Sequence, residues 1–557
     1  MRDRFHIILT ICALCVVSSL AVAREITQVD DDKPRVRPFI LDSIAISRAD
    51  VFDSTTIPII GGLLDHLHAL TKEKVIRQEI FREIGDTVTQ SDLDEIEQNL
   101  RGLTIFADIR IDVRTTAEEE VKEMPHATLY VWTQDSWSLR TAGSYNTNDT
   151  TISYSGSLRE ANLLGYGKTL GLSADYTNFN NRGWRYGTFY FNPNIFSTHI
   201  QIGGEAILSG PERSGYLFAA HPFFSDRTPY AFSALASYAF GPELSWLQRS
   251  RTEVVTSEVP AHRTTLSGWF SSAKPQVASS DVFRSSVSVM YNRMRRDAGA
   301  VFPRAFENSV GVFGGISSRR REYTRVVGAD MDGDVQVPIG AMGSVTVGKI
   351  APVSGGGDNV VYIGADAHQS VRWDNFIGSA AVESGTGLSG KSAQFTTFRS
   401  SLKGTYLFNP GALVTRISQS TVWNWPRYLA LPIDNLNGLR GYSQGAIFGD
   451  NRIVINTDLR FPSLLKIWIF DLGAAAFYDL GSVWRQSEQI GGIQFHSSAG
   501  LGIRVGNARA SIDKGWLRVD IPYNFDERRV SRIIISSQEA FDFFGTLDYR
   551  PPAPYLY

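Results

Sequence analysis

The sequence predicts a mostly β protein: a transmembrane antiparallel β-barrel preceded by a small α/β domain. Glycine and aromatic residues are plentiful, with 49 Gly, 32 Phe, 21 Tyr and 11 Trp among 557 residues. After residue 23 no apolar run reaches the roughly 20 residues that a membrane-spanning helix needs. From residue 136 to 541, short segments alternate apolar and polar residues. Strands of this kind cross a bilayer only when they close into a barrel.

The first 23 residues have the three parts of a secretory signal peptide. Arg2 and Arg4 form a basic start, and an apolar core follows at 7–17. Ala21-Val22-Ala23 then supplies the small residues that signal peptidase requires. An uncleaved membrane anchor is the alternative, but the core is shorter than the roughly 20 residues of a spanning helix. A lipoprotein start at Cys15 fits its preceding residues poorly, so we predict removal of residues 1–23.

The two cysteines, Cys12 and Cys15, both lie in this segment, so the processed chain is predicted to have none. Such a chain forms no disulfide, performs no thiol chemistry and holds no Cys-ligated metal. Charge is nearly balanced, with 55 Lys and Arg against 57 Asp and Glu. This balance gives no electrostatic reason to expect nucleic acid as a partner. We also expect no cofactor.

Residues 24–37 are polar and are interpreted as a linker, and residues 38–135 as a small α/β domain. Thr89 is a good helix N-cap, and Asp92 three residues later completes a capping box. Residues 50–70 fit the domain least well and are interpreted as an insertion. The expected order is β-α-α-β-β: a strand with Ile40, Ile44 and Ile46, a helix after Thr71 with Ile76 and Ile80, a helix with Leu93, Ile96 and Leu100, a strand over 107–113, and a partner strand through Leu129 and Val131.

From residue 136 to 541, two-residue alternation replaces helical periodicity. On each predicted strand one face is apolar, while the other carries charges and glycines. A soluble β-sandwich also alternates, but the signal peptide, the lack of cysteine and persistence over roughly 400 residues favour a lipid-embedded barrel. Closure also removes the unpaired strand edge that lipid does not tolerate. The clearest strands lie at 170–176, 453–461, 499–506 and 517–523.

The candidate functional site is a polar constellation near the C-terminus. Asp479 is predicted to face the lumen from a strand whose other face is apolar, with a glycine two residues away. A loop folded into the barrel would bring Arg440 within reach, and Arg–carboxylate pairs hold a fixed, often bidentate geometry. The alternative is that each residue is separately solvated in a wet lumen. The loop motif comprises Gly438, Leu439, Arg440, Gly441 and Tyr442, and the strand motif comprises Phe477, Asp479 and Gly481.

These motifs resemble the outer-membrane assembly-factor superfamily, which includes BamA, TamA, the two-partner secretion transporters and related surface-antigen barrels. GLRGY (438–442) is similar to the family's loop motif, and FYDLGSVW (477–484) is similar to its F-x-D-x-G strand motif. NLLGYG (162–167) resembles an early-barrel motif, and residues 85–111 resemble the core of a polypeptide-transport-associated (POTRA) domain. The resemblance covers roughly residues 38–541. It implies a sixteen-stranded barrel, a periplasmic N-terminal domain, and a lock between Arg440 and Asp479.

The resemblance further implies an outer-membrane insertase or translocase that works without ATP and without catalytic residues. Its expected partners are outer-membrane lipid, unfolded or nascent outer-membrane or secreted polypeptides, and periplasmic chaperones or accessory lipoproteins. The chain departs from the family in having one POTRA-like unit and a Pro- and Tyr-rich tail at 542–557. The alternative function is a passive outer-membrane channel or solute-uptake barrel, and a structural or adhesive barrel is a further one.

Two enzyme-like patterns carry less weight. Gly441-Tyr442-Ser443-Gln444-Gly445 matches the G-x-S-x-G elbow of serine hydrolases. That elbow requires a helix after it, whereas a β-type run follows here. His66 and His68 could share a metal, but only Asp65 lies nearby as a further ligand. We therefore expect neither hydrolysis nor a metal site.

Overall fold

A computed structural model describes residues 36–555, apart from 52–67 and the short segments given below. The predicted signal peptide, most of the predicted linker, and His66 lie outside the described residues. No helix in the described part of the chain is long and apolar enough to span a bilayer. The remaining undescribed segments are 117–118, 120–121, 148–151, 179–181, 226–227, 249–253, 276–280, 297–305, 331–332, 354–357, 391, 426–430, 444–446, 468–469, 486–492, 508–516, 532, 537–539, 542–543 and 545–546.

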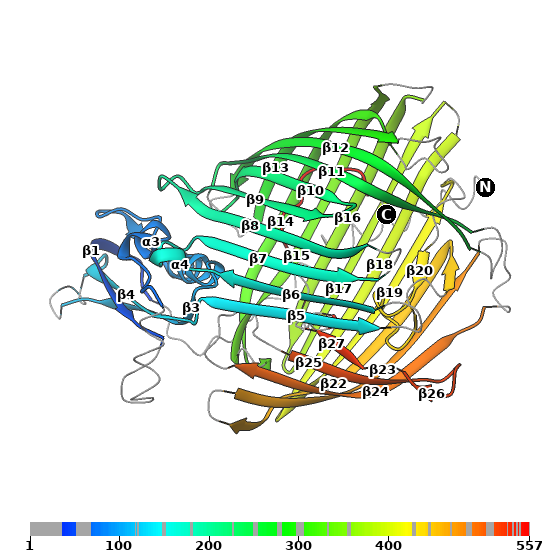
Figure 1. The fold of residues 1–557 in the computed structure, drawn as a ribbon. Coiled ribbons are helices and arrows are strands. Elements are labelled where there is room, and N and C mark those ends of the chain that lie inside the picture. The colour runs from blue at the N-terminus through cyan, green and yellow to red at the C-terminus, as the bar shows by residue number, and fades with distance from the viewer. Residues whose placement is uncertain are drawn as a thin grey trace.

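The N-terminal residues form a mixed four-stranded sheet with two helices, at one end of the barrel (Figure 1). The sheet order is β2-β1-β4-β3, in which β1 and β4 are parallel and β3 pairs antiparallel with β4. The five predicted elements are all present, and β2 is a short addition. With β2 included, the elements of this unit are β1 (Phe39–Ala49), α3 (Glu73–Gln78), β2 (Thr87–Val88), α4 (Gln90–Gly102), β3 (Phe106–Arg114) and β4 (His126–Asp135).

Helix α4 begins as predicted. The Thr89 backbone N–H donates to Asp92 Oδ2 at 2.8 Å, and the Thr89 hydroxyl donates to the same oxygen at 2.7 Å. The Asp92 carboxylate thereby supplies a partner for the N-cap backbone N–H, which is one half of a capping box. Leu93, Ile96 and Leu100 then face the sheet and are buried in the core of this unit.

The rest of the chain forms a closed antiparallel barrel (Figure 1). Its strands are β5 (Leu139–Thr147), β6 (Ile152–Glu160), β7 (Thr169–Thr177), β8 (Gly183–Ile195), β9 (Ile200–Ser209), β10 (Arg213–His221), β11 (Tyr230–Gln248), β12 (Val254–Pro275), β13 (Asp281–Arg296), β14 (Ser309–Asp330), β15 (Gly333–Pro352), β16 (Val360–Trp373), β17 (Phe376–Ser389), β18 (Ser392–Phe408), β19 (Gly411–Trp423), β22 (Asn451–Ile467), β23 (Phe470–Trp484), β24 (His496–Asn507), β25 (Leu517–Asn524), β26 (Arg529–Val530) and β27 (Ile534–Ser536). Off the barrel wall lie a 3-10 turn, η1 (Leu163–Gly165), and a small ribbon of β20 (Leu431–Ile433) and β21 (Ile447–Gly449).

The expectation of sixteen strands is wrong: over the described residues the barrel has 20 strand positions, counting the two short pieces β26 and β27 as one. The number sixteen came from the family resemblance alone. Alternation identifies strands but does not count them, because strand length varies; β12 and β14 each have 22 residues. Barrel diameter grows with strand number. A wall of this many strands therefore encloses a lumen that its own inward side chains do not fill.

The two faces of the wall differ as the alternation predicts. On β24, Leu501 and Ile503 are exposed on the outside, while Arg504 is buried toward the lumen. On β25, Leu517 and Ile521 are likewise exposed, while Asp520 is buried. An outward apolar face with inward charges is the arrangement of a barrel that lies in lipid.

This arrangement predicts the cost of charge on each surface. Leu501 is 68% exposed on the outer wall, and Leu164 is 70% exposed in η1, beside the N-terminal domain. Leu501→Arg should destabilise the membrane-inserted barrel by about 2–4 kcal/mol, because lipid cannot solvate the guanidinium. Leu164→Arg, the matched control, should cost about 0–1 kcal/mol. Denaturant unfolding in vesicles measures both, and equal costs would contradict the outward placement of Leu501.

Candidate functional site

The connection between β19 and β22 folds into the barrel and carries the predicted loop motif. Its ribbon, β20 and β21, pairs Leu431 with Gly449 and Ile433 with Ile447. Leu439 at the tip is fully buried in a cluster that includes Ile433 and Val454. The loop is therefore held against the inner wall by apolar packing as well as by charge.

Arg440 and Asp479, which the sequence places on this loop and on β23, lie in direct contact. Arg440 Nε donates to Asp479 Oδ2 at 2.7 Å, and Nη2 donates to Oδ1 at 2.8 Å. The Arg440 backbone N–H also donates to Asp479 Oδ2 at 3.2 Å. The side chains are 2% and 0% exposed. A bidentate pair this deeply buried fixes both the position and the orientation of the loop.

Two further carboxylates surround the same guanidinium. Arg440 Nη2 donates to Asp458 of β22 at 2.6 Å, and Nη1 lies 3.6 Å from Asp520 of β25. Each of these carboxylates has its own arginine: Arg460 donates to Asp458 at 3.0 Å, and Arg504 donates to Asp520 at 2.7 Å. Arg518 Nε also lies 3.6 Å from Asp520, so four arginines surround three aspartates and each buried carboxylate has a cationic partner.

The other two residues of the strand motif shape the space around this pair. The ring of Phe477 lies 3.7 Å from the Arg440 guanidinium carbon. The outer edge of this ring has room because Gly500 carries no side chain; a Cβ there would lie 2.4 Å from Phe477 Cζ. Gly481 similarly admits the loop, since a Cβ would lie 2.3 Å from Ile433 Cδ1. The strand motif therefore combines a stacking ring, a carboxylate and a clearance for the loop.

The loop motif uses its glycines for conformation and close approach. Gly438 and Gly441 have φ angles of +101° and +87°, a backbone conformation that residues with a Cβ atom rarely adopt. A Cβ on Gly441 would lie 3.1 Å from Pro522 of β25. Tyr442 anchors the far end by donating its hydroxyl to the Ser497 carbonyl at 3.1 Å.

Sequence reasoning missed Asp458, Asp520 and Asn456 as parts of this site. Asn456 Nδ2 donates to Asp479 Oδ1 at 2.7 Å and to the Gly438 carbonyl at 2.6 Å. All three residues lie on predicted polar faces of strands, and this position was the sequence feature that could have identified them as part of the site. Choosing them over other inward residues requires the register between strands, which alternation does not give.

A second buried polar cluster joins the N-terminal domain to the barrel. Asp135 Oδ2 accepts from the Thr71 backbone N–H at 2.7 Å and from the Thr71 hydroxyl at 2.8 Å, and it lies 2.9 Å from His68 Nε2. Asn162, from the NLLGYG motif, donates to Thr71 Oγ1 at 2.8 Å. The Lys72 N–H donates to the Gly165 carbonyl at 2.9 Å. The early-barrel motif therefore docks the domain, and His68 is a structural residue at this junction.

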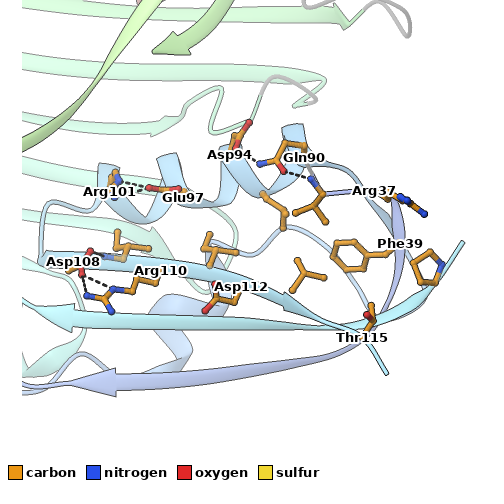
Figure 2. A pocket seen from close by; sticks show the side chains of 16 residues that line it. Arg37, Phe39, Gln90, Asp94, Glu97, Arg101, Asp108, Arg110, Asp112 and Thr115 are labelled. Carbon is orange, nitrogen blue, oxygen red and sulfur yellow. Dashed lines mark hydrogen bonds and ion pairs between the residues drawn. The ribbon is translucent and has the colours of Figure 1, made fainter. Parts of the chain in front are cut away.

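The N-terminal domain also carries a groove of about 970 Å³ between α4 and β3 (Figure 2). Phe39, Leu93 and Ile111 give it an apolar floor. Its helical rim bears charge, including an ion pair of 2.7 Å between Arg101 and Glu97. Strand β3 is the outer strand of the sheet, since it pairs only with β4 within the described residues. The groove thus runs beside an unpaired strand edge.

The serine of the G-x-S-x-G pattern does not meet the requirements of a nucleophile elbow. Ser443 is exposed in the loop, and the next described element is strand β21. Such an elbow places the serine between a strand and a helix. In the described part of the chain, no group of three or more His, Cys, Asp or Glu side chains is arranged to hold a metal ion.

Comparison with known proteins gives a likeness of fold only. No family model and no curated protein matches the sequence. Among solved structures, BamA from Haemophilus ducreyi lacking POTRA domains 1–3 matches at 11% identity and a TM-score of 0.35, over 89% of this chain and 84% of that one. CdiB from Acinetobacter baumannii matches at 11% identity and 0.41, over 89% and 73%. The FrpB iron transporter from Neisseria meningitidis matches at 9% identity and 0.36, over 78% and 84%. These low scores do not separate assembly barrels from uptake barrels.

The buried pair predicts strong coupling between its two residues. Arg440→Ala and Asp479→Ala should each raise the rate of protease cleavage within the loop, because either change leaves a buried charge unpaired, at a cost of about 3–5 kcal/mol. The loss of loop stability in the double variant should be smaller than the sum of the losses in the two single variants. Arg440→Lys should also loosen the loop, since an ammonium cannot bond both carboxylate oxygens in one plane.

Leu436→Ala is the matched control, because Leu436 lies exposed on the same loop. It should leave the cleavage rate unchanged. Strictly additive losses in the Arg440 and Asp479 cycle would show that the two side chains act independently.

The junction predicts a pH dependence of domain attachment. Burial lowers the pKa of His68, but the hydrogen bond and charge of Asp135, with Asp50 and Glu160 nearby, outweigh burial and raise the pKa overall. Protonated His68 therefore stabilises the junction fully below its unfolded pKa of about 6.5, and this contribution is lost as pH rises through the raised pKa. Protease release of the N-terminal domain should be slower at about pH 6 than at about pH 9.

His68→Gln should abolish that pH dependence. His126→Gln should preserve it, because the His126–Asp42 pair is exposed and away from the junction. Release that slows as pH rises in the unmodified protein would contradict this account of His68.

Proposed function

We propose that this protein is an outer-membrane barrel that inserts or translocates polypeptide clients. In this proposal a client first adds a strand to β3 in the N-terminal domain and then passes to the barrel. Outer-membrane lipid is the barrel's solvent, and chaperones or accessory lipoproteins would deliver clients. No residue is assigned a catalytic role. The observation that carries the proposal is the seam where the barrel closes.

Within the described residues, the seam between β27 and β5 has fewer paired positions than any other two neighbouring strands of the wall. Over the described residues a single pair joins these strands, Ile535 opposite Tyr145. On its other edge, β5 pairs with β6 along its whole length. Strand β27 has three residues and pairs with β25 over all of them. Unpaired backbone in lipid is costly, so such an edge favours the addition of another strand.

The Arg440 loop holds the hairpin next to this seam. The Gly441 carbonyl accepts from Asn524 Nδ2, at the end of β25, at 3.2 Å and from Ser531 Oγ, just after β26, at 3.0 Å. The Ser531 N–H in turn donates to the Pro522 carbonyl at 2.7 Å. We propose that the lock keeps this hairpin in place while β5 and β27 separate. Loss of the lock would then impair activity without preventing insertion of the barrel itself.

The groove in the N-terminal domain supports the first step. An extended peptide added to β3 would satisfy its own backbone on the strand edge and place alternate side chains in the groove (Figure 2). The apolar floor would take hydrophobic side chains, and the Arg101 and Asp94 rim would take polar ones. These features suit an unfolded polypeptide better than a folded partner.

The passive-channel alternative requires an open lumen. Here the Arg440 loop occupies part of the lumen and is pinned to four neighbouring strands, β22 to β25. Residues near the C-terminus occupy the opposite wall, where Tyr549 contacts Ser286 of β13 and Tyr555 contacts Tyr362 of β16. Because the Arg440 loop and the C-terminal residues fill part of the lumen, free diffusion of solutes is disfavoured. A function in which segments of the protein move is favoured instead.

The seam provides the test. Tyr145→Cys combined with Ile535→Cys places two thiols directly across β5 and β27. Tyr145→Cys combined with Tyr154→Cys places them across the fully paired β5 and β6, and is the matched control. Oxidation of the seam pair should block insertion of an outer-membrane protein client into vesicles, and reduction should restore it. Oxidation of the control pair should leave insertion unchanged.

An oxidised seam variant that inserts clients as fast as its reduced form would contradict opening at this seam. Loss of activity in both oxidised variants would show only a need for a flexible β5, and would equally contradict the assignment to the seam.

A further inference from the structure

The C-terminal residues lie inside the barrel and follow its wall. Of this segment the structure describes 540–541, 544 and 547–555. Arg460 Nη2 of β22 donates to the Phe541 carbonyl at 3.0 Å, and Lys403 of β18 donates to the Phe544 carbonyl at 3.0 Å. The segment then reaches β12 to β18, and Figure 1 shows the C-terminal end within the outline of the barrel.

Tyr555 sits in a site built on strands β16 and β18. Its hydroxyl donates to Asp366 Oδ1 of β16, and its backbone N–H donates to the Tyr362 hydroxyl at 2.7 Å. Thr397 of β18 donates to the Tyr555 carbonyl at 2.9 Å. Asp366 and Tyr362 are buried, and a Cβ at Gly364 would lie 3.0 Å from the Tyr555 ring. The wall thus binds both the side chain and the backbone of this residue.

Tyr549 and the residues after it are held in the same way. The Tyr549 hydroxyl lies 2.6 Å from Ser286 Oγ, and its ring packs against Phe223 and Trp269. Arg550 pairs with Glu383 of β17. Pro552 is buried, its carbonyl accepts from Ser288 Oγ of β13, and its ring packs on Gly315 of β14.

We infer that the inner wall of β12 to β18 is a binding site for an extended polypeptide segment carrying Tyr and Pro, and that the chain's own C-terminus occupies it and closes the lumen. On the bound segment, the groups that the wall contacts are tyrosine hydroxyls and rings, the proline ring, the arginine cation and the backbone. Glycines of β14 and β16 leave the room that the Pro552 and Tyr555 rings occupy. This inference concerns what fills the lumen at rest and holds whatever the barrel transports.

The test separates the segment from the barrel. A chain ending at Gly545 should still fold and migrate as a heat-modifiable barrel, because the last strand among the described residues ends at Ser536. In planar bilayers its conductance should exceed that of the full chain several-fold. A synthetic peptide of residues 546–557 (TLDYRPPAPYLY), added at increasing concentration, should block it saturably.

Peptide variants test the contacts. The Tyr555→Phe peptide loses the hydroxyl bond to a carboxylate and should bind about tenfold more weakly. Asp366→Asn in the shortened barrel should weaken binding of the unmodified peptide. It should add little to the loss of affinity already caused by Tyr555→Phe in the peptide. The Ala553→Ser peptide is the matched control, because Ala553 is exposed, and it should block as well as the unmodified one.

A folded, shortened barrel with the conductance of the full chain would overturn the inference. So would a peptide block that is insensitive to Tyr555→Phe and to Asp366→Asn together.

If the shortened chain does not fold, the full chain still provides a test. A Cβ on Gly315 would lie 3.0 Å from Cβ of Pro552, which is shorter than the roughly 3.5–4.5 Å of a disulfide, so the two backbones would have to move slightly apart to accommodate the bond. Gly315→Cys with Pro552→Cys should form this bond in the folded barrel, and the oxidised protein should keep the low conductance of the full chain. Failure of the bond to form, or an open lumen in the oxidised protein, would overturn the placement of the segment.

Discussion

The buried charge of Arg440 is the interaction on which the lumenal architecture depends. One guanidinium from a loop contacts Asp479 at 2.7 Å and Asp458 at 2.6 Å, and it lies 3.6 Å from Asp520. Removing any member leaves charge uncompensated inside the wall, so the loop, β22, β23 and β25 hold one another in a single arrangement. The same loop then bonds the turn between β25 and β26, which lies next to the weakly paired closure of the barrel. A charge cluster inside the lumen is thereby connected to the edge that faces lipid.

Lipid imposes the second constraint. Backbone groups in the bilayer must be paired, and within the described residues β27 and β5 share a single paired position, fewer than any other two neighbouring strands of the wall. The rigid part of the molecule and its weak point are therefore neighbours. The N-terminal domain is held at the same end as the start of β5, through Asp135 and Asn162. A client on β3 would thus be presented close to the strand that it would join.

How much the sequence could predict depends on the range of the interactions. Alternation on β24 and β25 and the capping box at Thr89 are local, and the structure agrees with each of them. The loop and strand motifs pointed to Arg440 and Asp479 because family resemblance supplied the distant contact. Nothing local distinguishes Asp458 and Asp520 from other inward residues, since their meeting depends on register across four strands. The strand number was wrong for a different reason: it was taken from the family resemblance, and alternation does not count strands of variable length. The binding of Tyr555 by Asp366, 189 residues away, leaves no pattern in the tail beyond its Pro and Tyr content.

The central claim is that the barrel acts on polypeptides. Its most direct test is to deplete the protein in cells and to quantify every protein of the outer membrane and the secreted fraction, alongside uptake of small solutes. The account predicts that one or more membrane-inserted or secreted proteins disappear from their destination while their synthesis continues. An unchanged set of outer-membrane and secreted proteins, together with a loss of solute uptake, would contradict the account and favour an uptake barrel.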